Sequence, residues 1–171
     1  MPSENTSIKM RLTQIGSCET ENNLPSISVE RIEKTNLKIN YSVFVEINRP
    51  MSQVSVRVTL RYLYGTTNLF KGRLTCTFDI ENLSAFIELD EDKEEFNIKS
   101  DFLPTLIALS FSTTRGYFAR ELVGTALEAY PFPMVSSKSL MERVKYQVIS
   151  YFNSISTCYE DKEMPYNIPT D

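Results

Sequence analysis

Histidine is absent from the 171 residues, and this absence excludes more chemistry than any other count. Without histidine a chain cannot form a Ser-His-Asp triad, a Cys-His dyad or the usual proton shuttle. A zinc or iron site would have to use cysteines and carboxylates alone. Lysine, aspartate or tyrosine could still serve as a catalytic base, but the commonest base is missing. We therefore expect a protein that is not an enzyme and that holds no metal or other cofactor.

Cysteine and glycine are also scarce. The three cysteines, Cys18, Cys76 and Cys158, are odd in number, widely separated and without a CxxC pair. This pattern does not predict a disulfide framework or a thiolate metal site. Cys76 shares the parity of its apolar neighbours, so we expect it in the core. Five glycines are too few for a glycine-rich phosphate-binding loop, and no such motif occurs.

The chain also lacks a long apolar run and an excess of basic residues. No apolar stretch has the length that a bilayer requires, and the start MPSENTSIK is unlike a signal peptide. We therefore expect a cytoplasmic protein without membrane insertion. The net charge is −4 and the pI about 5.0. A nucleic-acid partner is not expected, because phosphate binding needs a dense Lys/Arg face.

What is present is an ordinary globular composition. Hydrophobic residues make up 42% and charged residues 23% of the chain, which suits one folded domain. We expect a disordered N-terminus at 1–7, a single domain at 8–155 and a C-terminal tail at 156–171. Residues 8–13 alternate in polarity and predict a short first strand, followed by a loop over 16–26.

Three further strands follow from an unbroken period of two. The apolar positions are Leu37, Ile39, Tyr41, Val43, Val45 and Ile47, then Val54, Val56, Val58, Leu60, Tyr62 and Tyr64, then Leu74, Cys76, Phe78 and Ile80. The opposite parity is polar, with Ser55, Arg57, Thr59, Arg61, Thr75 and Thr77. Short turns at 48–50 and 65–68 join these runs, so we expect a four-stranded antiparallel meander.

After Ile80 the parity shifts, which predicts a bulge or kink within a long last strand. Residues 88–95, ELDEDKEE, lack the glycine and ligand spacing of a calcium loop. We interpret them as a solvated connection or a first helical turn.

Two helices are expected after the strands. Apolar residues at steps of three and four predict a long helix at about 103–122, with Pro104 in its first turn and Gly124 at its end. A Pro-containing connection follows. Leu140, Val144, Val148 and Phe152 then step by four and predict a last helix that ends near residue 155. The fold class is therefore α+β, with both helices on one face of the sheet.

Small side chains lie at the centre of the long helix, in the segment SFSTTRG. They allow close approach of a second helix, so Ser110, Thr113 and Thr114 are candidate helix–helix contacts of an oligomer. The alternative is a weak helix centre that packing within the chain tolerates.

Some large apolar side chains do not fit the expected core. Such residues often mark an interface, and we interpret them as a polypeptide-binding groove formed by Phe44, Leu63, Phe70, Phe86, Tyr130, Phe132, Met134 and Met141. The alternative is that a helix or a sister subunit covers them.

The order of elements and several short motifs resemble the bacterial SecB export-chaperone family. The motifs are Phe102-Leu103-Pro104 at the start of the long helix, Gly124-Thr125 at its end, Ala129-Tyr130-Pro131-Phe132 in the connection and Pro133-Met134-Val135 before the last helix. In the first half only the strand pattern is similar. The resemblance covers about residues 8–155.

The resemblance implies an ATP-independent holdase that binds unfolded or partly folded polypeptide in apolar grooves. It also implies a homo-oligomer, a dimer or a tetramer built from two dimers. The family passes clients to the export motor through an acidic sheet surface, whereas here the polar sheet face carries Arg57, Arg61 and Arg73. Relatives also serve single dedicated partners, such as antitoxins. A structural or regulatory interaction protein that reuses the fold is therefore the competing hypothesis.

Overall fold

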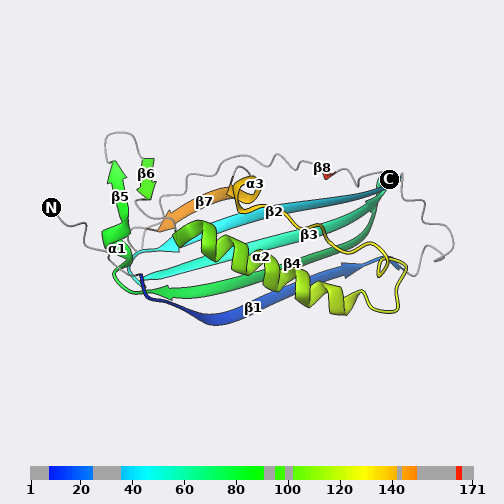
Figure 1. Cartoon of the computed structure of the whole chain (residues 1–171), viewed down its shortest axis with the longest axis horizontal. Coiled ribbons are helices and arrows are strands. Elements are labelled where there is room, and N and C mark those ends of the chain that lie inside the picture. The colour runs from blue at the N-terminus through cyan, green and yellow to red at the C-terminus, as the bar shows by residue number, and fades with distance from the viewer. Residues whose placement is uncertain are drawn as a thin grey trace.

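The computed structural model describes residues 8–24, 36–90, 95–98, 102–141, 144–149 and 165–166. The chain has an α+β fold with a mostly antiparallel main sheet and a few helices (Figure 1). The elements are β1 Met10–Asn22, β2 Leu37–Asn48, β3 Gln53–Tyr64, β4 Thr67–Ile80, α1 Leu83–Phe86, β5 Ile87–Asp90, β6 Glu95–Ile98, α2 Phe102–Glu121, α3 Ser137–Met141, β7 Val144–Ile149 and β8 Pro165–Tyr166.

Strands β2, β3 and β4 form an antiparallel meander, as their alternation predicts. The apolar parity of each strand is buried except at Tyr64, and the opposite parity is half-buried or exposed except at Asn40 and Leu69, which are buried. The turn between β3 and β4 is Gly65-Thr66, where Gly65 has a φ of 59°, in the left-handed region that favours glycine. These three strands supply most of the hydrophobic core.

The first strand differs from the prediction in length and in partner. β1 continues to Asn22, through the stretch expected to be a loop, with irregularities between residues 12 and 14 and between 16 and 19. It pairs with β4 rather than with β2, so the sheet order is β1-β4-β3-β2-β7. The four-stranded meander is therefore wrong for this strand. The chain between Asn22 and Leu37 is long enough for β1 to pair with a strand other than its sequence neighbour.

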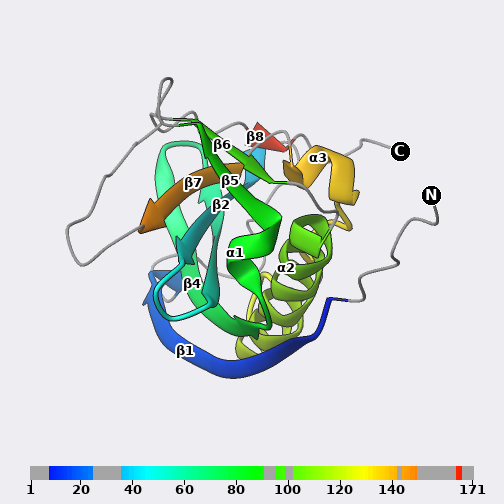
Figure 2. The same cartoon turned by 90° about the vertical axis from the view of Figure 1, so that its left-hand side faces the viewer.

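The long helix is confirmed as α2, and it covers one face of the sheet (Figures 1 and 2). The ring of Phe111 packs edge-on against Tyr41 of β2 at 5.4 Å, and Phe118 packs against Phe70 of β4 at 5.5 Å. The helix ends before Gly124, whose φ of 76° turns the chain away from the helix axis.

The last helix is largely wrong. Only Ser137–Met141 is helical, and Val144–Ile149 forms β7, which pairs in parallel with β2. A step of four residues, as between Val144 and Val148, fits a helix but also fits two periods of a strand. The β-branched and aromatic residues of the sequence VKYQVI favour the strand, and the edge of β2 is there to pair with it.

Residues 81–98 also depart from the prediction. Instead of one kinked strand, the chain turns at Glu81-Asn82, forms the short helix α1 and enters a separate hairpin of β5 and β6. Part of the acidic stretch interpreted as a connection, Glu88–Asp90 and Glu95, therefore lies in strands. Asn82 adopts a φ of 58°, which marks the point where the chain leaves the main sheet.

Three predictions fall mainly outside the described residues. These are disorder at 1–7, the helix beyond residue 149 and the tail at 156–171. Of that tail the structure describes Pro165–Tyr166, which pairs with β2 at Ile39 and Asn40.

Candidate polypeptide-binding surfaces

The small residues at the centre of α2 lie mainly against the sheet of their own chain. Ser110 and Thr114 are fully buried, and their hydroxyls donate to the carbonyls of Leu106 and Ser110, four residues earlier. Ser110 also lies within hydrogen-bonding reach of the Cys76 thiol on β4. Both residues are therefore misplaced in the predicted oligomer contact. Thr113 alone of the three is partly exposed, and small side chains here bring α2 close to β4.

Two of the eight groove residues belong to the core. Phe70 is 1% exposed and Phe132 is 4% exposed, so neither lines an open groove. Both rings contact Tyr62 of β3, with centroids 6.4 and 4.5 Å away. Phe70 follows the buried even parity of β4, which begins earlier than the sequence indicated. Phe132 is buried because the connection, residues 122–136, folds back over the sheet.

The Tyr62 hydroxyl fixes that connection in place. It donates a hydrogen bond to the backbone carbonyl of Tyr130. Burial raises the pKa of Tyr62, because the phenolate would lose its hydration in the core. The connection is therefore tied to β3 by one hydrogen bond at Tyr130 and one ring contact at Phe132.

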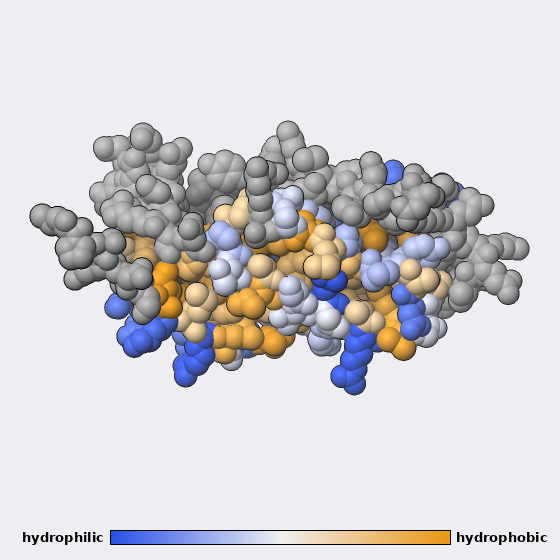
Figure 3. Space-filling model, in the orientation of Figure 1, coloured by the Kyte–Doolittle hydropathy of each residue, from blue (hydrophilic) through white to orange (hydrophobic). Residues whose placement is uncertain are grey.

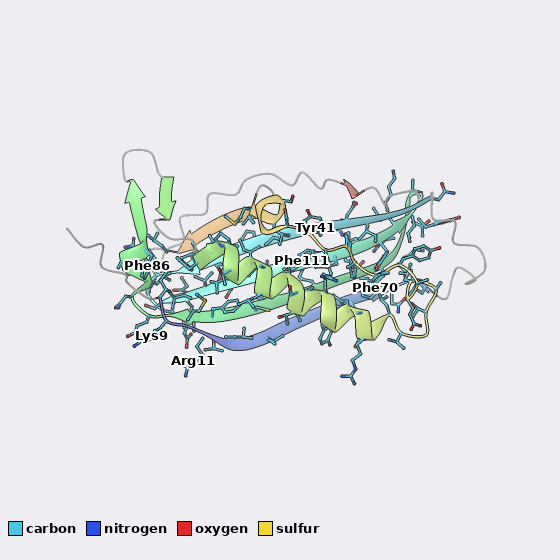
Figure 4. All side chains as sticks on the ribbon, viewed as in Figure 1. Lys9, Arg11, Tyr41, Phe70, Phe86 and Phe111 are labelled. Carbon is cyan, nitrogen blue, oxygen red and sulfur yellow. The ribbon has the colours of Figure 1, made fainter. Side chains whose placement is uncertain are left out.

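Three more of the predicted groove residues lie away from the connection. Phe44 and Leu63 are half-buried on the polar face of the sheet, and the Arg57 guanidinium lies 5.3 Å above the Phe44 ring. A cation over an aromatic face stabilises that pair and covers the ring. Phe86 lies at α1 and contacts the Phe102 ring at 6.0 Å (Figure 4). The eight residues therefore do not form one groove.

The remaining three we call the connection surface: Tyr130 and Met134 lie in the connection, and Met141 lies in the short helix α3 that follows it. Met134 is 84% exposed, the largest exposure of any bulky apolar side chain among the described residues. Tyr130 and Met141 are half-buried and pack on the core. Residues 131–136 have neither helical nor strand structure, so the connection presents Met134 from irregular backbone.

A second apolar surface was not predicted. We call it the edge surface, and it consists of Leu12 and Ile15 of β1 with Leu109 and Tyr117 of α2. These side chains are 44, 51, 50 and 41% exposed. Leu12 and Ile15 pair with Phe78 and Cys76, so they point to the helix-covered face of the sheet, one strand beyond the Ser110 contact. Apolar colour continues over α2 and the lower edge of the molecule in Figure 3.

Helix α2 has no charged residue before Arg115, which is unusual for a helix with one side facing solvent. A shallow depression of about 350 Å³ on this side is lined by Pro104, Thr105, Ala108, Leu109 and Ser112. Sequence reasoning missed the edge surface because no local pattern places β1 at the edge of the sheet beside β4. In addition, the side of a helix that stays exposed cannot be predicted until its packing partner is known.

Ion pairs line the junction of β1 with β4. Glu19 meets Arg73 and Glu21 meets Lys71, both at 2.8 Å, while Arg11 meets Asp79 at 3.1 Å. Lys71 donates a hydrogen bond to Glu21 and lowers the pKa of that carboxyl. The pKa of Asp79 is lowered by hydrogen bonds from Gln53 and then from Arg11. Lys9 pairs with Glu81 at 3.3 Å, and Figure 4 shows Lys9 and Arg11 projecting at the start of β1.

Within the part of the chain that the structure describes, no group of three or more Cys, Asp or Glu side chains could hold a metal ion. No described helix is both long and apolar enough to span a membrane. Cys76 is a buried free thiol, as predicted, and burial raises its pKa.

Comparison of the chain with protein-family models, curated proteins and solved structures finds no match in any of the three.

Proposed function

We propose that this protein is a SecB-like, ATP-independent chaperone that binds unfolded or partly folded polypeptide in the cytoplasm as a homo-oligomer. It acts by binding, without catalysis. The connection surface supplies the binding site, and the client is any chain segment with exposed apolar side chains.

The observation that carries this proposal is the exposure of Met134 beside the fixed residue Phe132. A methionine that is 84% exposed costs solvation free energy unless a partner covers it. Methionine is unbranched and polarisable, so it adapts to apolar side chains of different shape. A surface of this kind suits a protein that accepts varied clients.

The backbone of residues 131–136, which is neither helix nor strand, supports the same function. Tyr62 and Phe132 hold one part of the connection against the sheet, while Met134 projects from it. A client segment lying along this backbone can bury Met134, Tyr130 and Met141 together.

A dedicated partner protein is the second candidate. Phe70 and Phe132 are buried within the chain, which removes two large rings from the expected groove. The apolar surface that remains at the connection suits a short, defined segment of one partner. Coupling to an export motor lies outside the proposal, because the polar sheet face carries Arg57, Arg61 and Arg73.

The test is the refolding rate of a slow-folding denatured client, with this protein at matching concentration and no nucleotide. We expect a delay that grows with the concentration of the protein. Met134→Asp should weaken client affinity roughly tenfold, because burying a methionine contributes about 1.5–3 kcal/mol. Met51→Asp is the matched control, since Met51 is 62% exposed in the turn between β2 and β3.

Three outcomes are informative. A delay that Met134→Asp removes and Met51→Asp preserves supports client binding at the connection surface. A delay that both variants preserve moves the site elsewhere. A folded wild-type protein that causes no delay argues for the dedicated partner instead of the general chaperone.

A further inference from the structure

The methionines among the described residues differ strongly in exposure. Met134 is 84% exposed and Met51 is 62% exposed. Met10 and Met141 are half-buried and pack on the hydrophobic core. Oxidants convert the flexible, apolar thioether of methionine into a polar sulfoxide, and accessible side chains react first. The exposures therefore predict that Met134 and Met51 are oxidised quickly, and that Met10 and Met141 are oxidised slowly.

Oxidation of Met134 would change a binding surface and leave the core intact. The connection that carries Met134 runs between α2 and α3 (yellow in Figure 1). It is fixed by the buried ring of Phe132 against Tyr62 and by the hydrogen bond from Tyr62 to the Tyr130 carbonyl. The Met134 side chain lies mostly in solvent, so its oxidation removes little packing. A sulfoxide oxygen is hydrated on the free surface but loses that hydration when an apolar partner covers it.

We propose that Met134 is a reversible oxidation switch, whose conversion to methionine sulfoxide by a peroxide or a hypohalous acid weakens apolar binding at the connection surface. The effect on clients rests on the proposed function, because the switch regulates the same surface. The oxidation itself and the change in surface polarity do not depend on client binding.

The chemistry needs only the oxidant and, for the reverse step, a thiol reductase. The Met134 sulfur attacks one oxygen of hydrogen peroxide, so that an S–O bond forms and the O–O bond breaks. The sulfur loses two electrons, and the peroxide is reduced to water. Methionine sulfoxide reductases reverse the step. Two thiols then supply two electrons and form a disulfide, and the sulfoxide oxygen leaves as water.

Met51 gives an internal comparison for the role of position. Its exposure is also high, so it reacts with the same oxidants. Strand β3 begins at Gln53, directly after the turn that holds Met51, and Tyr62 lies near the other end of that strand. Met51 is therefore distant from the connection. Its oxidation should leave the connection surface unchanged.

Peptide mapping by mass spectrometry tests the reactivity of each methionine. The folded full chain, with Cys18→Ser and Cys158→Ser, is treated with hydrogen peroxide and sampled over time. Cys76 should not compete for the oxidant, because burial raises the pKa of its thiol and little thiolate forms. Met134 should be oxidised roughly tenfold or more faster than Met141. Equal rates at the two sites overturn the switch. Circular dichroism checks that the oxidised protein stays folded.

Client refolding tests the consequence of the oxidation. Peroxide treatment should weaken client affinity roughly tenfold, because it removes most of the apolar contribution of one methionine. A methionine sulfoxide reductase should restore the affinity. Met134→Leu keeps an apolar side chain without sulfur and should keep its client affinity after peroxide. Met51→Leu is the matched control and should lose affinity as wild type does. Equal losses in Met134→Leu and wild type overturn the switch.

Binding of the apolar dye ANS separates the switch from the chaperone function. Peroxide should lower the dye affinity of wild type and leave that of Met134→Leu unchanged. If the untreated protein does not delay refolding but shows this difference in dye binding, the chaperone function is wrong and the switch stands. If the untreated protein delays refolding but full oxidation of Met134 alters neither refolding nor dye binding, the switch is wrong and the proposed function stands.

Discussion

Gly72 of β4 lies beneath the ring of Phe118 of α2, with no room for a side chain between them. A Cβ atom placed on Gly72 would be 2.5 Å from Cζ and 2.6 Å from Cε1 of that ring. Phe118 is fully buried and also contacts Phe70, so the ring cannot move aside without disturbing the core. This contact sets how closely the C-terminal half of α2 approaches the sheet.

Gly72→Ala should therefore lower the free energy of unfolding by about 2 kcal/mol, within the usual range for overpacking a core. Gly116→Ala is the matched control, because a Cβ there has nothing within 4 Å and the residue is helical. That control should stabilise the helix by about 0.5–1 kcal/mol. Urea denaturation measures both changes. Equal effects of the two substitutions would contradict the close approach of α2 to β4.

Tyr62→Phe should lower the free energy of unfolding by about 1 kcal/mol at pH 7, because the Tyr130 carbonyl loses its hydrogen-bond donor. Tyr117→Phe is the control, since Tyr117 is 41% exposed. Denaturation curves at neutral pH compare the two. If Tyr62→Phe costs no more than the control, the hydrogen bond does not stabilise the connection.

The same pair of variants tests the ionisation of Tyr62. The pKa of Tyr62 is raised in the folded state, so its contribution to the free energy of unfolding is complete below about pH 10. This contribution is lost as the pH rises further, because the tyrosine of the unfolded chain ionises first. The free energy of unfolding should fall less steeply above pH 10 in Tyr62→Phe than in wild type, by up to about 1.4 kcal/mol per pH unit. Identical slopes would mean that Tyr62 is not buried in the folded state.

Asp79→Asn should reduce the loss of stability in acid. The pKa of Asp79 is lowered in the folded state, so the ionised carboxylate contributes to the free energy of unfolding above about pH 4. This contribution is lost as the pH falls below that value. Asp79 is solvent-accessible, so this effect should be smaller than that of the core substitutions. Thermal unfolding at pH 7 and pH 3 should show a smaller difference in melting temperature for Asp79→Asn than for wild type. A larger difference would be inconsistent with the contacts from Gln53 and Arg11.

Cys76 should be protected from thiol reagents in the native state. Its thiol is buried beneath α2 and its pKa is raised, so little reactive thiolate forms. In a background with Cys18→Ser and Cys158→Ser, labelling should be roughly a hundredfold slower or more in buffer than in denaturant. Rapid labelling of the folded protein would show that α2 does not cover β4 at this position.

Local sequence patterns were enough to predict the strands that short turns connect to their pairing partners. The alternation of β2, β3 and β4 specified both their parity and their pairing, because a hairpin leaves each strand only its neighbour to pair with. The long helix was equally clear, since its apolar period and the flanking Pro104 and Gly124 agree with one another.

The tertiary structure decided which distant segments meet. No local pattern predicts that β1 pairs with β4 or that β7 joins β2, because strand pairing across long connections depends on the whole sheet. The apolar period placed Thr114 on the covered face of the helix, but only the packing shows that Ser110 is also buried and that Leu109 is half exposed. The apolar face of a helix can be recognised from the sequence. Which of the residues flanking that face are buried depends on the element against which the helix packs.

By itself, the sequence therefore determined an α+β chain without histidine chemistry and with more apolar side chains than one obvious core needs. The tertiary structure decided where these side chains go. Phe70 enters the core because it follows the buried parity of β4, and Phe132 enters it because the connection, held at Tyr62, folds over the sheet. Leu12 and Ile15 stay exposed because β1 lies at an open edge. Burial depends on neighbours that are distant along the chain, and local periodicity does not contain that information.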